Sequence, residues 1–292
     1  MRVLVTGSAG HLGEAMVRTL VQLKYEVIGL DIRESPSTSY SIIDRSFVRR
    51  CLEGAKTVFH TATLHKPHIV THRPQAFVDT NITGTLNLLQ ESIAAGIEHF
   101  VFTSTTSVFG DALIPPPGAP AAWVTEEVAP VPKNIYGITK VAAEQLCHLF
   151  YRNHGLACIV LRTSRFFPEE DDDRNMRGAY PSDNLKVNEV LFRRVDLEDA
   201  VAAHLLAAQR ARAIGFGTYI ISATTPFLPE DAAELRTNAP AVVERRVPDY
   251  QAEYECRGWR MLRASTEFAS TNERERSFAG SQNTNSNVSS TA

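Results

Sequence analysis

The chain has 292 residues, of which 43% are hydrophobic and 22% are charged. This composition excludes a small disulfide-stapled domain and a wholly unfolded chain, because it supplies enough apolar surface for a large core. The formal net charge of −3 provides no basic surface for a nucleic-acid backbone or an anionic membrane. We therefore expect a protein that binds a small molecule, with no nucleic-acid partner and no membrane partner.

The four cysteines indicate a reducing compartment. Cys51, Cys147, Cys158 and Cys256 show neither a CxxC motif nor a paired spacing, which is typical of free thiols. No run approaches the roughly 18 apolar residues that a membrane span requires, and the N-terminal residues read as a strand rather than as a signal peptide. We expect a cytoplasmic protein.

Short apolar runs bounded by turn residues alternate with amphipathic segments along most of the chain. Apolar residues three and four apart, as in 12–23 and 86–93, indicate helices. The runs expected to form buried strands are 3–5, 27–30, 57–59, 100–102, 158–161 and 219–221. This alternation predicts an α/β fold with a doubly wound parallel sheet of the Rossmann type.

The domain organisation follows from these elements. We predict a dinucleotide-binding Rossmann domain over residues 1–165, completed by about 190–223. A small C-terminal substrate-binding region is expected over about 166–189 and 224–262. Residues 263–292 are rich in Ser, Thr and Asn, so we expect a polar tail that is disordered or aberrant.

Two further segments depart from the alternation. Six prolines between Ile114 and Lys133 prohibit a helix and indicate a long ordered loop. The acidic run 169–173 is typical of a solvated face.

A glycine-rich turn follows the first predicted strand and begins a helix. Gly7 suits a tight turn, Gly10 allows a pyrophosphate to approach the backbone, and Gly13 allows close packing of helix on strand. His11 and Leu12 carry amides at the helix start that can hold an anion. The turn predicts a dinucleotide site.

Asp31 ends the second predicted strand, where a carboxylate can accept hydrogen bonds from the adenosine ribose. Its charge favours NAD, whereas Arg33 could pair with the 2′-phosphate of NADP. We expect NAD, with NADP as the alternative.

Tyr136 and Lys140 are four residues apart in a predicted helix and therefore share a face. A phenol is a poor base at neutral pH, but a neighbouring ammonium stabilises the phenolate. The pair therefore predicts an acid–base group. Residues 103–107 add five hydroxyls at the carboxyl end of a strand, where open α/β sheets bind ligands.

Taken together, these motifs resemble the extended short-chain dehydrogenase/reductase family, in its NAD-dependent epimerase/dehydratase branch. The resemblance runs from Met1 to about Ala223. It rests on the order of TGSAGHLG, Asp31, HTAT from His60, NITGTLNLL, TSTTSVFG, YGITK and RRVDLEDAVAAHLLA.

The resemblance implies a role for each matching residue. Tyr136 would be the acid–base, Lys140 would bind the nicotinamide ribose, and Thr105 would orient the substrate hydroxyl. Asp44 would contact adenine, and the remaining residues of the cofactor cleft would be Thr61, Ala62, Thr63 and Asn81. The resemblance also implies a homodimer, formed through the Tyr136 helix and the helix over 74–95.

Departures from the family pattern narrow the substrate. Thr106 and Ser107 replace the Asp–Glu pair of the dehydratases, so dehydration is disfavoured. Arg165 replaces a substrate-binding Asn of the sugar-nucleotide members and could clamp a carboxylate or phosphate. His65 and its neighbours His68 and His72 are expected to face substrate, and we predict no metal site.

Three function classes stay open. The first is an NAD-dependent epimerase-like oxidoreductase that transiently oxidises a secondary alcohol of a sugar or sugar nucleotide. The second is an NAD(P)-dependent reductase or dehydrogenase of a smaller carbonyl or alcohol. The third is a cofactor-binding protein without turnover, which the Tyr136–Lys140 pair disfavours.

Overall fold

Six parallel strands form the central sheet, in the order β2-β1-β3-β4-β6-β9. The computed structural model describes residues 1–32, 41–166, 174–265 and 267–269. The strands of this sheet are β1 (Arg2–Thr6), β2 (Glu26–Leu30), β3 (Thr57–His60), β4 (His99–Thr105), β6 (Ala157–Thr163) and β9 (Phe216–Ile221). Each contains one of the predicted apolar runs, so the prediction of a parallel Rossmann sheet is confirmed.

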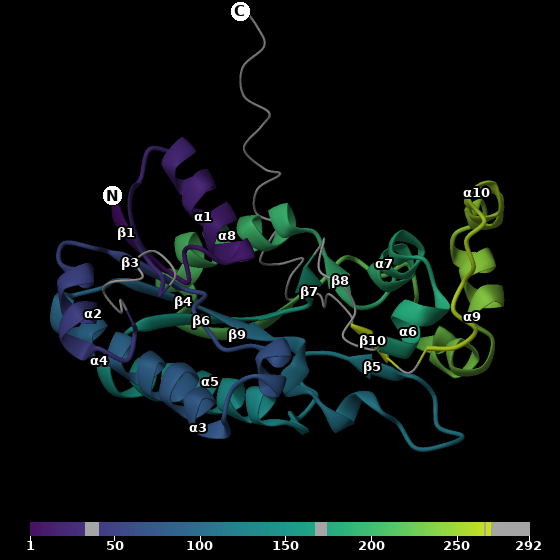
Figure 1. Cartoon of the computed structure of the whole chain (residues 1–292), viewed down its shortest axis with the longest axis horizontal. Coiled ribbons are helices and arrows are strands. Elements are labelled where there is room, and N and C mark those ends of the chain that lie inside the picture. Colours follow the sequence, from purple (N-terminus) through teal and green to yellow (C-terminus); the bar gives the residue numbers. More distant parts are fainter. Residues whose placement is uncertain (33–40, 167–173, 266, 270–292) are drawn as a thin grey trace, which may run out of the picture.

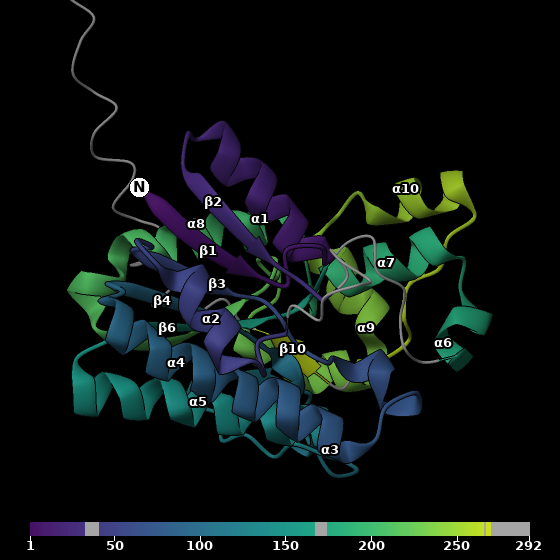
Figure 2. The same ribbon diagram turned by 60° about the vertical axis from the view of Figure 1, so that its left-hand side comes forward.

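Helices cover both faces of this sheet (Figure 1). One face carries α1 (His11–Gln22) and α8 (Leu197–Ile214), and the other carries α2 (Arg45–Leu52), α4 (Gly84–Ala95) and α5 (Ile135–His154). The predicted helices over 12–23 and 86–93 correspond to α1 and α4. The view in Figure 2 shows α4 and α5 lying side by side beneath the sheet.

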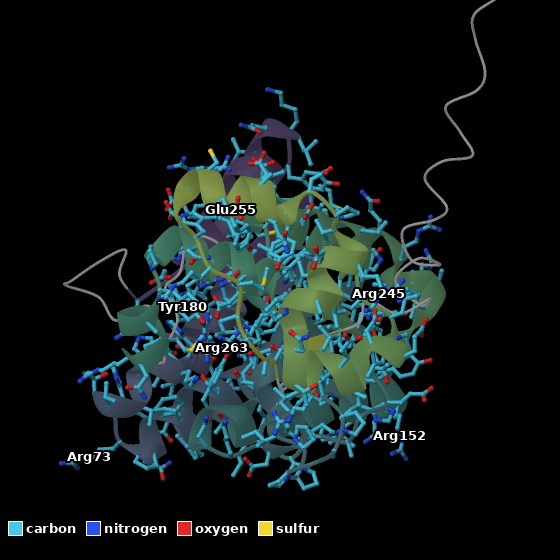
Figure 3. The ribbon with its side chains drawn as sticks, turned by 90° about the vertical axis from the view of Figure 1, so that its right-hand side faces the viewer. Arg73, Arg152, Tyr180, Arg245, Glu255 and Arg263 are labelled. Atoms are coloured by element: carbon cyan, nitrogen blue, oxygen red, sulfur yellow. The ribbon has the colours of Figure 1, made fainter. Side chains whose placement is uncertain are left out.

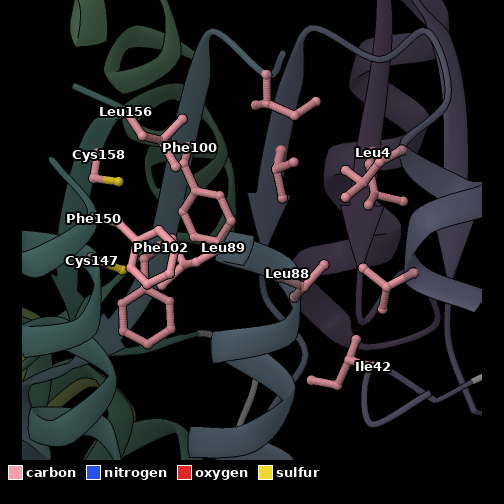
Figure 4. Packing of buried hydrophobic residues seen from close by; sticks show 14 of the residues in the cluster. Leu4, Ile42, Leu88, Leu89, Phe100, Phe102, Cys147, Phe150, Leu156 and Cys158 are labelled. Carbon is pink, nitrogen blue, oxygen red and sulfur yellow. The ribbon is translucent and has the colours of Figure 1, made fainter. Parts of the chain in front are cut away.

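Successive residues of the inner strands pack on opposite faces, which explains their continuous apolar runs. Phe100 and Phe102 of β4 pack with Leu89 and Cys147 of the α4 and α5 helices (Figure 4). Val101 lies between them in sequence and packs instead in the cluster beneath α1 and α8. Both faces of β4 are therefore core, and its polar carboxyl end is the part left to line a site.

A smaller group of elements lies beyond the carboxyl ends of the strands, at the right of Figure 1. Its own core contains Phe192, Phe227, Leu235 and Val242. Its helices are α6 (Arg174–Ala179), α7 (Ser182–Val190), α9 (Ala232–Arg246) and α10 (Tyr250–Arg257). Two small parallel sheets join it to the rest: β7 (Arg165–Phe166) with β8 (Arg194–Val195), and β5 (Ala122–Val124) with β10 (Glu267–Ala269).

The sequence predicts a disordered or aberrant tail from residue 263, but the structure pairs the first residues of this segment with the rest of the fold. The Ala239 amide donates to the Arg263 carbonyl, and the Ser265 amide donates to the Leu235 carbonyl. The strand β10 then pairs with β5, which lies within the predicted proline-rich loop. Strand pairing uses backbone N–H and C=O groups, which every non-proline residue has, so a polar segment can still add a strand to a sheet. Residues 270–292 and the acidic run 169–173 lie outside the described residues.

The remaining elements are short. The α-helix α3 spans Pro74–Phe77, and a π-helix, η2, continues it over Val78–Thr83. The 3₁₀ segments are η1 (Lys66–Val70), η3 (Thr106–Val108), η4 (Asp111–Leu113) and η5 (Pro229–Asp231). In the part of the chain that the structure describes, no helix is long and apolar enough to cross a membrane.

Candidate active site

Two glycines of the glycine-rich turn, Gly7 and Gly13, have no room for a side chain. Gly7 adopts a positive φ of 71°, and a Cβ there would lie 2.7 Å from the Ala62 amide nitrogen. A Cβ on Gly13 would lie 1.9 Å from the Gly7 carbonyl oxygen. Gly10 is the N-cap of α1, and because glycine has no side chain, this residue forms no side-chain cap on the first amides of the helix. The turn therefore presents bare backbone and a helix start, as a pyrophosphate requires.

Asp31 lies beside this turn. Its Oδ2 accepts from the Ala9 amide at 3.0 Å, and the Gly7 amide donates to the Leu30 carbonyl at 2.7 Å. These bonds hold the end of β2 against the turn and keep the carboxylate at the cleft edge, within reach of a ribose. Arg33 lies outside the described residues.

One large cleft of about 960 Å³ connects the turn with the carboxyl ends of β3, β4 and β6. Most of the predicted site residues line it. They are Gly7, Gly10, His11, Leu12, Gly13, Asp31, Thr61, Ala62, Thr63, His65, Thr105, Thr106, Tyr136 and Arg165. Asp44, Asn81 and Lys140 are not among its lining residues.

The two proposed reacting side chains reach the cleft from different elements. Thr105 ends β4, and its Oγ1 accepts from the Ser107 amide at 3.1 Å. Tyr136 lies in the first turn of α5, which Asn134 caps by accepting from the Gly137 amide at 2.9 Å. A Cβ on Gly137 would come within 3.0 Å of the Ser107 carbonyl oxygen, so the start of α5 packs closely against the end of β4.

Lys140 lies behind this pair, almost fully buried. Its Nζ donates to the Thr103 carbonyl at 2.6 Å and lies 4.0 Å from the centre of the Phe102 ring. Burial lowers the pKa of Lys140 to about 7, although nearby Glu144 acts in the opposite direction. The side chain therefore changes between ammonium and amine near neutral pH, and its contact with a ribose stays a prediction.

Asn81 braces the cleft instead of lining it. Its Oδ1 accepts from the Leu64 amide at 2.8 Å and from Thr63 Oγ1 at 3.0 Å. Its Nδ2 donates to the Leu64 carbonyl and to Thr139 Oγ1. The side chain, placed by the π-helical turn η2, ties the loop after β3 to α5.

His60 has a similar bracing role. Its Nδ1 and Nε2 lie 2.8 Å from the hydroxyls of Thr6 and Thr85, so one ring joins β1, β3 and α4. Burial, with the Lys140 charge adding to it, holds the pKa of His60 well below its ordinary value, so the ring stays neutral. The HTAT motif thus supplies a structural histidine followed by cleft residues.

Asp44 lies at the start of α2, and its contact with adenine stays a prediction. Its carboxylate caps α2 by accepting from the Phe47 amide at 3.0 Å and from Ser46 Oγ at 2.7 Å. These hydrogen bonds lower the pKa of Asp44. The preceding residues 41–43 line the cleft, so Asp44 follows directly on lining residues while its own side chain caps the helix.

Sequence reasoning missed two lining residues at the far end. Phe192 and Arg193 border the cleft together with Arg165 and Phe166. The available signal is Arg193, which begins the RRVDLEDAVAAHLLA motif and directly precedes β8. The rings of His65 and His68 also line the cleft. They pack edge to face, with 4.4 Å between the ring centres.

Comparisons with known proteins identify the family to which the sequence is similar. A sequence model of the family described as "NAD dependent epimerase/dehydratase family" matches residues 3–221. An uncharacterised protein of Sinorhizobium fredii is 34% identical over 166 residues, which cover 54% of this chain and 39% of that protein. UDP-glucose 4-epimerase of Erwinia amylovora is 32% identical over 167 residues, covering 50% and 47%. The chain spans about half the length of these curated relatives.

Solved structures share the fold over nearly the whole chain. A short-chain dehydrogenase/reductase superfamily protein of Agrobacterium tumefaciens with bound NAD gives a TM-score of 0.69 at 22% identity, covering 96% of this chain and 92% of that one. UDP-glucose 4-epimerase of Thermotoga maritima with UDP-glucose gives 0.63 at 23% identity, covering 95% and 92%.

Proposed function

Because the chain belongs to the NAD dependent epimerase/dehydratase family, we propose that it is an epimerase-like oxidoreductase that transiently oxidises a secondary alcohol of a sugar or sugar nucleotide. Membership confirms the predicted family, the expected class of enzyme and, at the level of the family, the expected cofactor NAD. Relatives described as UDP-glucose 4-epimerases support the sugar-nucleotide class for this chain.

The residues present fit NAD. The backbone at Gly7 and Gly13 leaves no room for a Cβ, and Gly10, His11 and Leu12 at the start of α1 line the cleft. Asp31 provides an acceptor for ribose hydroxyls at the same end of the cleft. These residues would hold the pyrophosphate and the adenosine half.

In the proposed reaction, the substrate carbinol loses a proton and a hydride to become a ketone. NAD, when bound, would supply the reversible hydride acceptance that this oxidation needs. Tyr136 takes the hydroxyl proton and gives it back, while Thr105 Oγ1 hydrogen-bonds the reacting oxygen. Lys140, anchored on the Thr103 carbonyl, would in its protonated form supply a positive charge that favours a phenolate.

A single observation carries this proposal: Tyr136 and Thr105 border the same cleft as the glycine turn, although they come from α5 and β4. We expect Tyr136→Phe to lower turnover of UDP-glucose, or of whichever sugar proves active, by at least about 100-fold, since general acid–base catalysis contributes about that much or more. Stopped assays of epimer formation would measure it.

The matched control is Tyr151→Phe, on the same helix but absent from the cleft lining, which should turn over like the wild type. Both variants should bind NAD with unchanged affinity by calorimetry. Normal turnover by Tyr136→Phe would refute the acid–base assignment.

Release of cofactor separates this function from a dehydrogenase of a smaller alcohol. An epimerase recycles its NAD, so denaturing the purified protein should release about one NAD(H) per chain, detected by absorbance and mass. A protein that is purified empty and exchanges added NAD would favour the dehydrogenase instead.

A further inference from the structure

A buried histidine on α8 takes no part in the proposed reaction. Arg152 and Arg245 reach the protein surface (Figure 3), as charged side chains usually do. His204 is instead fully buried against β4. Its Nε2 lies 2.8 Å from Thr103 Oγ1, and its Nδ1 lies 2.7 Å from the Ala200 carbonyl oxygen. Both ring nitrogens are therefore hydrogen-bonded.

These two contacts determine which atom carries each proton. A carbonyl oxygen can only accept, so His204 Nδ1 must donate to Ala200. Burial lowers the pKa of His204 to about 4, although the hydrogen bond to Ala200 acts in the opposite direction, so the ring is neutral at physiological pH. A neutral imidazole has one N–H. The Nε2 atom therefore has no proton, and the Thr103 hydroxyl must donate to it.

The Thr103 side chain connects this histidine with the cleft. Thr103 is only partly buried, and it lines the cleft together with Thr105. Its hydroxyl faces α8, whereas the next hydroxyl, that of Ser104, donates to Glu144 of α5. The alternation along β4 therefore places Thr103 and Thr105 on the same face of the sheet. Because the Thr103 hydroxyl gives its proton to His204, it can offer a ligand only an acceptor.

The neighbours of Thr103 indicate which ligand group it meets. Its carbonyl accepts from Lys140 Nζ at 2.6 Å, and Lys140 is the residue expected to hold the nicotinamide ribose. Thr103 also lies about 7 Å before Thr105 along β4, and hence deeper than the residue expected to orient the substrate hydroxyl. Both observations favour the nicotinamide end of NAD over the substrate.

We propose that Thr103 Oγ1 accepts a hydrogen bond from the carboxamide NH₂ of the nicotinamide ring, and that His204 is a positioning residue that holds the Thr103 hydroxyl in this polarity. The carboxamide carries the N–H donors of that ring, and the other hydrogens of the ring are bonded to carbon. This inference rests on the proposed function, which gives the chain its cofactor, and adds two residues to the expected cofactor site.

The test compares NAD with 3-acetylpyridine adenine dinucleotide, in which a methyl group replaces the amide nitrogen. Calorimetry on protein freed of bound cofactor gives both dissociation constants. Thr103→Val removes the acceptor and keeps the carbonyl that holds Lys140. We expect it to weaken NAD binding by at least about five-fold, since the buried amide loses its partner, and to leave binding of the acetyl analogue unchanged.

Variants of His204 test its positioning role. In His204→Leu the Thr103 hydroxyl is free to rotate and to donate to the carbonyl that both dinucleotides carry. The preference for NAD should therefore fall towards that of Thr103→Val. His204→Gln keeps a donor for Ala200 and an acceptor for Thr103, so it should retain the preference. A purely structural role of His204 would lower the melting temperature of these variants without changing the preference.

Thr57→Val is the matched control. Thr57 lies on β3 with its Oγ1 3.4 Å from His99 Nδ1, but it is absent from the cleft lining. This variant should bind both dinucleotides like the wild type.

Unchanged NAD binding by Thr103→Val, or equal weakening of both dinucleotides, would overturn the carboxamide contact. If circular dichroism shows that Thr103→Val does not fold, the comparison of His204→Leu with His204→Gln provides the same readout. In each of these cases a wild type that binds NAD leaves the proposed function standing. A wild type that binds neither dinucleotide would instead refute the proposed function.

Discussion

Lys140 shows how a single residue connects fold stability with chemistry. Its ammonium is buried against Phe102 and the Thr103 carbonyl, where water cannot solvate the charge. The pKa of about 7, far below its ordinary value of 10.5, means that the folded protein binds this proton less tightly than the unfolded chain does. Folding stability therefore rises with pH as the solution passes from about 7 towards 10.5.

The Lys140→Met variant tests this linkage. At pH 6.5 the wild type holds a buried charge that methionine lacks, whereas at pH 9.5 the buried lysine is neutral and the difference shrinks. We expect the melting temperature of Lys140→Met, relative to wild type, to be several degrees higher at pH 6.5 than at pH 9.5. Thermal unfolding followed by circular dichroism measures it.

Lys133 supplies the comparison. Its side chain is exposed, so water solvates the ammonium in the folded protein. Lys133→Met should show the same offset from wild type at both pH values. An offset for Lys140→Met that does not change with pH would show that the ammonium is not destabilised by burial.

At the scale of elements, a buried ion pair joins three of them behind the proposed site. Glu144 of α5 accepts from Arg162 of β6 at 2.7 Å and from Ser104 Oγ of β4 at 2.5 Å. The Arg162 guanidinium also stacks 5.0 Å from the centre of the Phe109 ring. Ser104 directly precedes Thr105, so this network fixes the end of β4 on which the substrate oxygen would be oriented.

We expect Arg162→Met to lower the free energy of unfolding by about 3–5 kcal/mol, because it leaves the Glu144 carboxylate buried without its cation. Arg45→Met is the control. Glu91 is also buried, but Arg45 is half exposed and Arg49 would still pair with that carboxylate, so a loss of at most about 1 kcal/mol follows. Urea unfolding measures the free energy of unfolding of both variants. Equal losses would contradict a stabilising role for the buried Glu144–Arg162 pair.

For the whole molecule, the face formed by α4 and α5 stays the candidate surface for a homodimer. Ile138 and Leu149 are 52% and 44% exposed, and their spacing of eleven residues places them on one side of α5. Ile93 of α4 is 36% exposed. A row of exposed apolar side chains on two neighbouring helices is typical of a helix-packed interface.

Leu149→Arg tests this interface. We expect sedimentation to show a dimer for the wild type and a monomer for the variant, with the same melting profile at low concentration. Val21→Arg, equally exposed but on α1 at the opposite face of the sheet, should stay dimeric. A wild-type protein that sediments as a monomer at tens of micromolar would refute the predicted dimer.

Local patterns were enough to predict much of this protein. Buried parallel strands need continuous apolar runs, and the runs at 100–102 and 158–161 stand out in the sequence for that reason. The glycine turn is similarly readable, since only glycine tolerates the backbone of Gly7 and the packing at Gly13. Tyr136 and Lys140 share a helix face at a fixed spacing, which any helix imposes.

Tertiary structure decided what each polar side chain does. Asn81 braces a loop against Thr139, because its partner comes from the packing of elements and not from the neighbouring sequence. Arg165 reaches Glu189 only when β7 and α7 pack together. A contact between residues distant in sequence depends on how the elements pack, and hydrophobic periodicity fixes those elements without fixing which polar groups will meet.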